Sequence, residues 1–156
     1  MKRNWKSLLL ALALPLAVGG LSALLSGGGM EAFESMAKPP LSPPGWLFPV
    51  AWSILYLLMG YASWRVFFSP ADNGQIRSAL TVYLIQLFFN FCWSILFFRF
   101  GLYWFAFGWL MALWVLILCS LVLFGRIDRT AGWLLVPYIL WVSFAAYLNF
   151  GVAWLN

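Results

Sequence analysis

Five long stretches of apolar residues alternate with short polar, glycine-rich or proline-rich segments along the chain. Each stretch holds about 20 residues or more, enough for a helix to cross the roughly 30 Å hydrocarbon core of a bilayer. No segment shows the period-two alternation that is typical of strands. The sequence therefore predicts an all-α integral membrane protein, a bundle of five transmembrane helices in a single domain over residues 1–156. The predicted helices cover approximately residues 7–26, 45–68, 77–99, 102–124 and 131–155.

The loop between the first two predicted helices is long for such a compact chain. Its first part, Met30 to Ala37, has the pattern of two amphipathic helical turns, so we expect a short helix there. A strap with four prolines follows, from Lys38 to Pro44. Proline holds the backbone extended and is excluded from the interior of helices. Long loops of this kind often act as lids, and we expect a lid here.

The composition excludes a soluble globular protein. Hydrophobic residues make up 65% of the chain and charged residues only 8%, whereas about a quarter of the residues in a soluble domain are charged. The net charge of +5 comes from nine Lys or Arg against four acids. These basic residues lie between the apolar runs, where they orient membrane helices. We therefore do not expect nucleic acid as a partner.

The basic residues also predict the orientation in the membrane. With five crossings, seven of them fall on the N-terminal side and two on the other side. The N-terminal side has Lys2, Arg3, Lys6, Arg65, Arg77, Arg126 and Arg129, and the other side has Lys38 and Arg99. Positive residues concentrate on the cytoplasmic side, so we expect the N-terminus in the cytoplasm and the C-terminus outside.

The first apolar run has a second interpretation, as a signal peptide. A cut after Ser26 would leave Leu24 at the −3 position, where a small residue is needed, and the run is long for the apolar region of a signal. These features favour a retained first helix.

Ionisable groups are missing from the middle of the predicted helices. The sequence has no histidine, and no Asp or Glu falls inside a span. Proton-coupled carriers normally need such groups, and hydrolytic enzymes need a base beside the nucleophile. We therefore assign no catalytic residue. We also expect no metal site, because Cys92 and Cys119 fall inside apolar runs and are interpreted as small buried side chains.

Neutral polar and aromatic residues remain as candidates for a binding site. Gln86, Asn90 and Ser94 follow one another at intervals of four and share one helix face. They either hydrogen-bond to neighbouring helices or line a cavity, and the spacing favours neither. Trp52 and Trp141 lie about two turns inside their helices, deeper than the interfacial anchors that are common near helix ends. An aromatic pocket with few polar groups would suit a flat, largely apolar ligand. The tryptophans that suit an anchoring role are Trp46, Trp104, Trp133 and Trp154.

Three groups of motif residues follow one another along the chain. They are Lys38-Pro39, Pro43-Pro44, Phe48-Pro49, Trp52, Leu55-Tyr56, Met59-Gly60 and Ala62; then Gln86, Phe89-Asn90, Trp93-Ser94 and Phe97-Phe98; then Val136-Pro137-Tyr138, Trp141, Phe144-Ala145 and Tyr147-Leu148-Asn149-Phe150. In order and spacing they resemble the tryptophan-rich sensory protein/translocator protein family, over nearly the whole chain. The resemblance implies a five-helix bundle, usually a homodimer, with a porphyrin-binding cavity that the first loop caps.

The resemblance also implies roles for individual residues. Trp52 and Trp141 match the paired tryptophans of the family's cavity, and Phe33 matches the aromatic residue of its lid. Further residues of the cavity wall are Pro43, Tyr56, Asn90, Trp93, Ser94 and Ala145. The lid departs from the family at Leu41, where a tryptophan is usual, and at Ala32-Phe33, where Trp-Tyr is usual.

We therefore expect a membrane receptor or sensor that binds a tetrapyrrole, such as protoporphyrin IX or haem, or a related flat apolar molecule. It would take part in the transport, sensing or disposal of that ligand, without a required cofactor. Membrane lipid and a second copy of the chain are the other expected partners. One alternative is light-dependent breakdown of bound porphyrin, with Trp52 and Trp141 as redox partners, and another is a small facilitative carrier. A sterol ligand is not assigned, because no Lys or Arg follows Tyr147.

Overall fold

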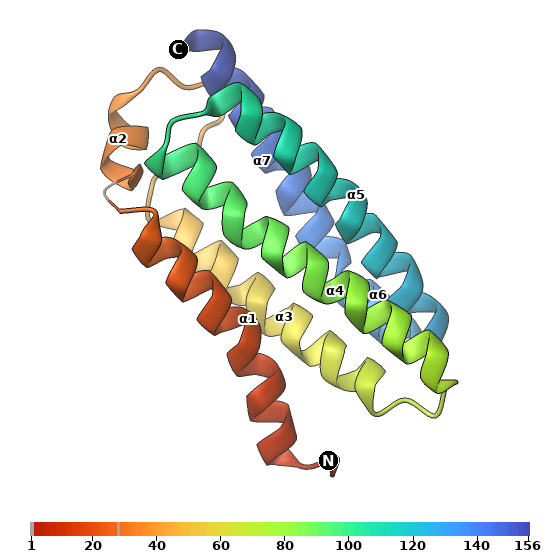
Figure 1. The fold of residues 1–156 in the computed structure, drawn as a ribbon. Helices are drawn as coiled ribbons and strands as arrows, with labels where there is room; N and C mark the ends of the chain where they lie inside the picture. Colours follow the sequence, from red (N-terminus) through yellow and green to blue (C-terminus); the bar gives the residue numbers. More distant parts are fainter. Residues whose placement is uncertain (1, 28) are drawn as a thin grey trace.

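The computed structural model describes residues 2–27 and 29–156, and within them five helical segments are long and apolar enough to cross a membrane (Figure 1). The predicted fold class is therefore confirmed. The first three spans are α1 (Trp5–Leu25), α3 (Leu47–Phe67) and α4 (Asn73–Ser94), which the π-helical turn η1 (Ile95–Arg99) extends. The others are α5 (Tyr103–Ile127) and the pair α6 (Arg129–Leu134) and α7 (Val136–Leu155).

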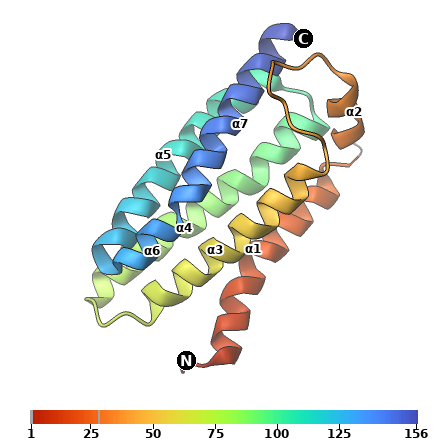
Figure 2. The same cartoon turned by 180° about the vertical axis from the view of Figure 1, so that it is seen from behind.

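The spans run side by side, and the two ends of the chain lie at opposite ends of the bundle (Figure 1). The short helix α2 (Gly29–Ser35) and the proline strap lie at the end where α7 finishes, as both views show (Figure 2). We call this the lid end. The helical turns expected between Met30 and Ala37 are thus present, and the odd number of crossings agrees with the sequence.

Helix α4 begins earlier than predicted, at Asn73 and not near Arg77. The carboxylate of Asp72 accepts hydrogen bonds from the backbone N–H groups of Gly74 at 2.9 Å and Gln75 at 3.3 Å. An aspartate at this position stabilises a helix start, because the first N–H groups have no partner inside the helix. The polar residues between Asp72 and Arg77, which lie before the predicted helix, therefore form its first turn.

The last span begins at Arg129 and is divided at Leu135, whereas a single helix from residue 131 was predicted. Asp128 caps α6 by accepting hydrogen bonds from the N–H groups of Thr130 and Ala131. Pro137 lies in the first turn of α7. Since proline has no N–H to donate, the helical ladder is interrupted there.

Helix α1 packs closely on α3 and α4. A Cβ atom on Gly60 of α3 would lie 2.7 Å from the carbonyl oxygen of Ala11 and 2.9 Å from Cα of Leu12, so only glycine permits this approach. Higher along α1, the hydroxyl of Ser22 donates a 2.8 Å hydrogen bond to the carbonyl of Phe91 in α4. Small residues in membrane helices favour such backbone contact.

Large apolar side chains cover the outer surface of the bundle. Leu24, Trp154 and Trp46 are 78%, 73% and 66% exposed, as expected for side chains that face lipid or its interface. The four tryptophans interpreted as anchors are all exposed: Trp46, Trp104, Trp133 and Trp154.

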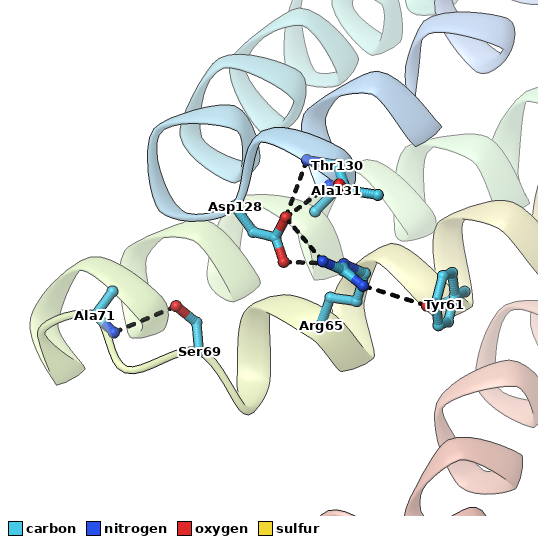
Figure 3. Close-up of polar contacts among 7 residues, drawn as sticks. All are labelled: Tyr61, Arg65, Ser69, Ala71, Asp128, Thr130 and Ala131. Carbon is cyan, nitrogen blue, oxygen red and sulfur yellow. Dashed lines mark hydrogen bonds and ion pairs between the residues drawn. The ribbon is translucent and has the colours of Figure 1, made fainter.

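At the end opposite the lid, Arg65 of α3 forms an ion pair with Asp128 (Figure 3). Nε of Arg65 lies 2.9 Å from Oδ2 of Asp128, and Nη1 donates to the hydroxyl of Tyr61 at 3.3 Å. Burial alone would raise the pKa of Asp128. The hydrogen bonds from Arg65 and from the N–H groups of Ala131 and Thr130 outweigh it and hold this pKa below its ordinary value. One carboxylate therefore caps α6 and fastens it to α3.

Candidate functional site

A cavity of about 630 Å³ lies between α1 and α3 near the lid end. This volume is within the range of roughly 300–1,000 Å³ that is usual for small-molecule pockets. Aromatic rings form much of its wall, from Phe48, Trp52 and Tyr56 of α3 and Phe98 of η1. Gly19 and Gly20 of α1 form part of the opposite wall. A flat ligand between these walls could stack on the aromatic rings.

Trp52 and Trp141 lie together, but only Trp52 lines this cavity. The Trp52 ring stacks on Tyr56, with ring centroids 5.6 Å apart, and meets Trp141 edge to face. Trp141 lies behind Trp52 and lines a separate groove of about 440 Å³ between α3 and α7. Its indole Nε1 is buried and has no hydrogen-bond partner among the described residues. Trp141 therefore supports Trp52 from behind.

The three polar residues on one face of α4, Gln86, Asn90 and Ser94, do not share one role: some bond to neighbouring helices and one lines the cavity. Asn90 joins three helices: its side-chain oxygen accepts from Tyr56 of α3 at 3.0 Å, and its amide donates to the hydroxyl of Tyr138 of α7 at 2.6 Å. The Tyr138 hydroxyl in turn donates to Gln86 at 2.6 Å. Ser94 lines the cavity, and its hydroxyl has no hydrogen-bond partner among the described residues. Gln86 and Asn90 thus hold helices together, whereas Ser94 is free to bond a ligand.

Trp93 and Ala145 lie in the packed core. Trp93 is 4% exposed, and its indole N–H donates to Asn149 of α7 at 3.0 Å. The amide of Asn149 donates to the carbonyl of Tyr103 at 2.9 Å, which links α7 to the start of α5. Ala145 is 4% exposed. Neither Trp93 nor Ala145 is part of the cavity wall described above, and their contact with a ligand stays a prediction.

Phe33 fastens the lid to the bundle. It is 2% exposed and packs edge-on against Phe48, with ring centroids 5.3 Å apart, and against Phe98 at 6.0 Å. Both of these partners line the cavity, so Phe33 covers its wall without lining it. Pro43 is half-buried in the strap and lies outside the cavity lining.

The strap and the residue before it, Ala37, are tied to α7 and its C-cap residue at three points. The hydroxyl of Tyr147 donates to the carbonyl of Pro40 at 2.6 Å, and the side chain of Asn156 donates to the carbonyl of Ala37 at 2.8 Å. Pro39 packs against Gly151 so closely that an added Cβ would overlap its ring. The lid is therefore closed over this end of the bundle in the structure.

Several lining residues were not assigned to the site from the sequence, among them Gly19, Gly20, Phe48 and Phe98. The spacing of four residues along one helix face could have identified two of them. Phe48 precedes Trp52 by four residues, and Phe98 follows Ser94 by four, so each shares a face with a predicted residue. The two glycines carry no such signal, because their contribution is the space that they leave open.

The chain is similar to known proteins over its whole length. A sequence model of the TspO/MBR family matches residues 11–155. The Tryptophan-rich protein TspO of Chlorobaculum tepidum is 34% identical over 157 residues, which cover 100% of this chain and 99% of the relative. The Tryptophan-rich sensory protein of Cereibacter sphaeroides is 36% identical over 156 residues, 100% and 95% of the two chains. The Translocator protein of Ovis aries is 32% identical over 129 residues, 81% and 75% of the two chains. This chain is an integral membrane protein that belongs to the TspO/MBR family.

Proposed function

We propose that this protein binds a tetrapyrrole, such as protoporphyrin IX or haem, or a related flat apolar molecule, in the cavity between α1 and α3. The observation that carries the proposal is the aromatic wall of Phe48, Trp52, Tyr56 and Phe98 around about 630 Å³. Aromatic rings stack favourably on extended π-systems. The free hydroxyl of Ser94 supplies a hydrogen bond within the same cavity. The role of binding would be transport, sensing or disposal of the ligand, and no cofactor is required for it.

A second candidate function is light-dependent breakdown of the bound porphyrin. The direct contact between Trp52 and Trp141 favours it, since Trp52 would touch the ligand and Trp141 lies behind it. An experiment under illumination distinguishes the two candidate functions. Breakdown predicts that porphyrin absorbance bleaches faster with the protein than without it, and binding alone does not.

Filling the cavity tests the proposal. Gly20 lines the cavity, and a Cβ atom there would meet no atom within 4 Å, so Gly20→Leu places a side chain in free space. Gly108 of α5 is a matched control: it also lies in a helix, has open space at its Cβ, and is not part of the cavity. We expect Gly20→Leu to weaken porphyrin binding at least tenfold and Gly108→Leu to leave it unchanged. Equal binding by the two variants in an absorbance titration would refute this site.

We also propose that the protein lies in the bacterial inner membrane with its N-terminus in the cytoplasm. The support is the seven-to-two division of Lys and Arg between the two ends of the bundle. We further propose a homodimer, as the family resemblance implies. The exposed apolar residues of α1, such as Leu9, Leu10 and Leu21, give one surface on which a second copy could pack.

A further inference from the structure

Glu34 is the only carboxylate among the described residues that line the cavity. It lies on α2, and Ser26, Gly27 and Trp46 are also part of the cavity lining. The other polar side chains of the lining are uncharged hydroxyls or the indoles of Trp46 and Trp52. A ligand in the cavity therefore meets a formal negative charge at the lid end and none elsewhere in the described lining.

The carboxylate of Glu34 is not engaged in a direct contact with another charged or polar side chain among the described residues. It forms no ion pair or hydrogen bond with another side chain in that part of the structure. The nearby Lys38 ammonium donates instead to the backbone carbonyls of Phe33 at 3.1 Å and Glu34 at 2.8 Å, and it does not line the cavity. Arg99 likewise donates to the carbonyl of Leu25 at 3.0 Å. The Lys38 ammonium keeps its charge beside α2 but forms no ion pair with Glu34, so the Glu34 carboxylate stays available to contact a molecule in the cavity.

We propose that Glu34 is a specificity-determining residue that selects ligands by the charge of the end facing α2. It favours flat aromatic ligands with a positively charged or neutral group at that end and disfavours ligands with a carboxylate there. This inference rests on the proposed function of the cavity and adds a preference within the tetrapyrrole class. Like charges a few ångströms apart repel each other even when water reaches them. A porphyrin with free propionates must direct them away from α2 or bind less tightly.

Three porphyrins that share one ring test the idea: protoporphyrin IX with two carboxylates, its neutral dimethyl ester, and a bis-amide derivative that carries two primary amines. Their dissociation constants are measured by absorbance titration on the full-length protein in neutral micelles. We expect Glu34→Gln to strengthen binding of the dicarboxylate about fivefold, to weaken binding of the diamine by a similar factor, and to leave the ester unchanged. Both shifts should shrink as salt is raised from about 10 mM to about 0.5 M.

Glu31→Gln is the matched control, because Glu31 is also exposed on α2 but does not line the cavity. It should leave all three dissociation constants unchanged. Unchanged affinity for the ester also shows that Glu34→Gln keeps the cavity intact. If Glu34→Gln shifts neither charged porphyrin, or Glu31→Gln shifts them equally, the assignment of specificity to Glu34 is wrong while porphyrin binding stands. If none of the three binds to the wild-type protein, the proposed function fails, and this inference fails with it.

Discussion

The indole ring of Trp52 meets that of Trp141 edge to face, with ring centroids 6.4 Å apart and ring planes inclined by 87°. Of these two tryptophans, Trp52 lines the cavity between α1 and α3, whereas Trp141 lines the groove between α3 and α7. The two residues should therefore contribute to ligand binding in different ways. Trp52 would stack on the ligand, and Trp141 would hold the Trp52 ring in place.

Replacing each tryptophan with phenylalanine separates these contributions. We expect Trp52→Phe to weaken porphyrin binding by about 0.5–1.5 kcal/mol, the contribution of an aromatic pair beyond its buried area. Trp141→Phe should weaken binding by a smaller amount, because it loosens Trp52 without removing a ligand contact. Absorbance titration of bound porphyrin measures both.

Trp133→Phe is the control for these two variants. Trp133 is 63% exposed, lies in α6 and does not line the cavity, so its replacement should leave binding unchanged. Trp109 would be a poor control, because its indole N–H donates to the carbonyl of Phe89 at 2.8 Å and its ring stacks on that residue. A larger loss for Trp141→Phe than for Trp52→Phe would contradict the assigned roles.

The hydroxyl of Tyr138 should stabilise the bundle. It accepts a hydrogen bond from Asn90 and donates one to Gln86, both at 2.6 Å and both buried. Tyr138→Phe leaves both partners without this bond, and we expect a loss of about 0.5–2 kcal/mol in unfolding free energy. Tyr103→Phe is the control, because the Tyr103 hydroxyl has no hydrogen bond among the described residues. Unfolding followed by circular dichroism in micelles gives both values, and equal stability of the two variants would show that the Tyr138 bonds contribute nothing.

Gly19 should be intolerant of a side chain, unlike its neighbour. A Cβ atom on Gly19 would overlap the ring of Tyr56, which its hydrogen bond to Asn90 holds in place. A Cβ atom on Gly20 would meet nothing within 4 Å. We expect Gly19→Ala to destabilise the protein by about 1–3 kcal/mol through overpacking, and Gly20→Ala to have little effect. The measurement is thermal unfolding of the two variants in the same detergent. Equal unfolding midpoints would mean that α1 moves to accommodate the added methyl group without loss of stability.

The ion pair between Arg65 and Asp128 should make stability depend on pH in acid. The pKa of Asp128 in the folded protein lies below its ordinary value of 3.8. The stabilisation is therefore complete above about pH 4 and is lost as pH falls through the lowered pKa. Because both side chains remain partly accessible to solvent, we expect Asp128→Asn to cost only about 0.5–1 kcal/mol at pH 7.

The same cost should shrink as the wild-type carboxyl is protonated below pH 4. Unfolding free energies of the wild type and Asp128→Asn between pH 3 and pH 7 would show this convergence. Asp72→Asn serves as the control, because asparagine caps a helix about as well as aspartate. A difference between the wild type and Asp128→Asn that persists unchanged at pH 3 would exclude a role for the Asp128 charge.

Accessibility of single cysteines tests the proposed orientation. Leu41 in the strap is 85% exposed, and Asn73 is exposed at the opposite end of the bundle. After replacement of Cys92 and Cys119, a cysteine at residue 41 should react in whole cells with a reagent that does not cross the membrane. A cysteine at residue 73 should react only after the cells are opened. The reverse pattern would place the N-terminus outside.

The helices could be predicted from the sequence because each one follows from its own residues. An apolar run such as residues 102–124 must be helical to satisfy its backbone in lipid. The start of α4 at Asn73 was not predicted because it depends on the helix cap at Asp72. The residues around this cap are polar and do not continue the apolar pattern of the helix. Local patterns therefore fix the number and order of spans better than their ends.

The division of roles within the cavity could not be predicted in this way. Asn90 and Ser94 share one face of α4, yet Asn90 bonds to Tyr138, which is 48 residues away in the sequence, and Ser94 lines the cavity. Trp141 matches a family motif, but the rotation of α7 decides which side of Trp52 it contacts. Such outcomes depend on how helices are placed relative to one another, and no single run of residues encodes that.

The hydrogen bond from Tyr56 to Asn90 also determines which polarity the cavity offers to a ligand. The Tyr56 hydroxyl has one hydrogen, and Asn90 receives it at 3.0 Å. Only the lone pairs of the Tyr56 oxygen remain free, so this hydroxyl can accept a hydrogen bond from a ligand but cannot donate one. A molecule that forms a hydrogen bond with Tyr56 must therefore supply the donor, as an N–H of a metal-free pyrrole ring would. A carbonyl group of a ligand would find no donor in this hydroxyl.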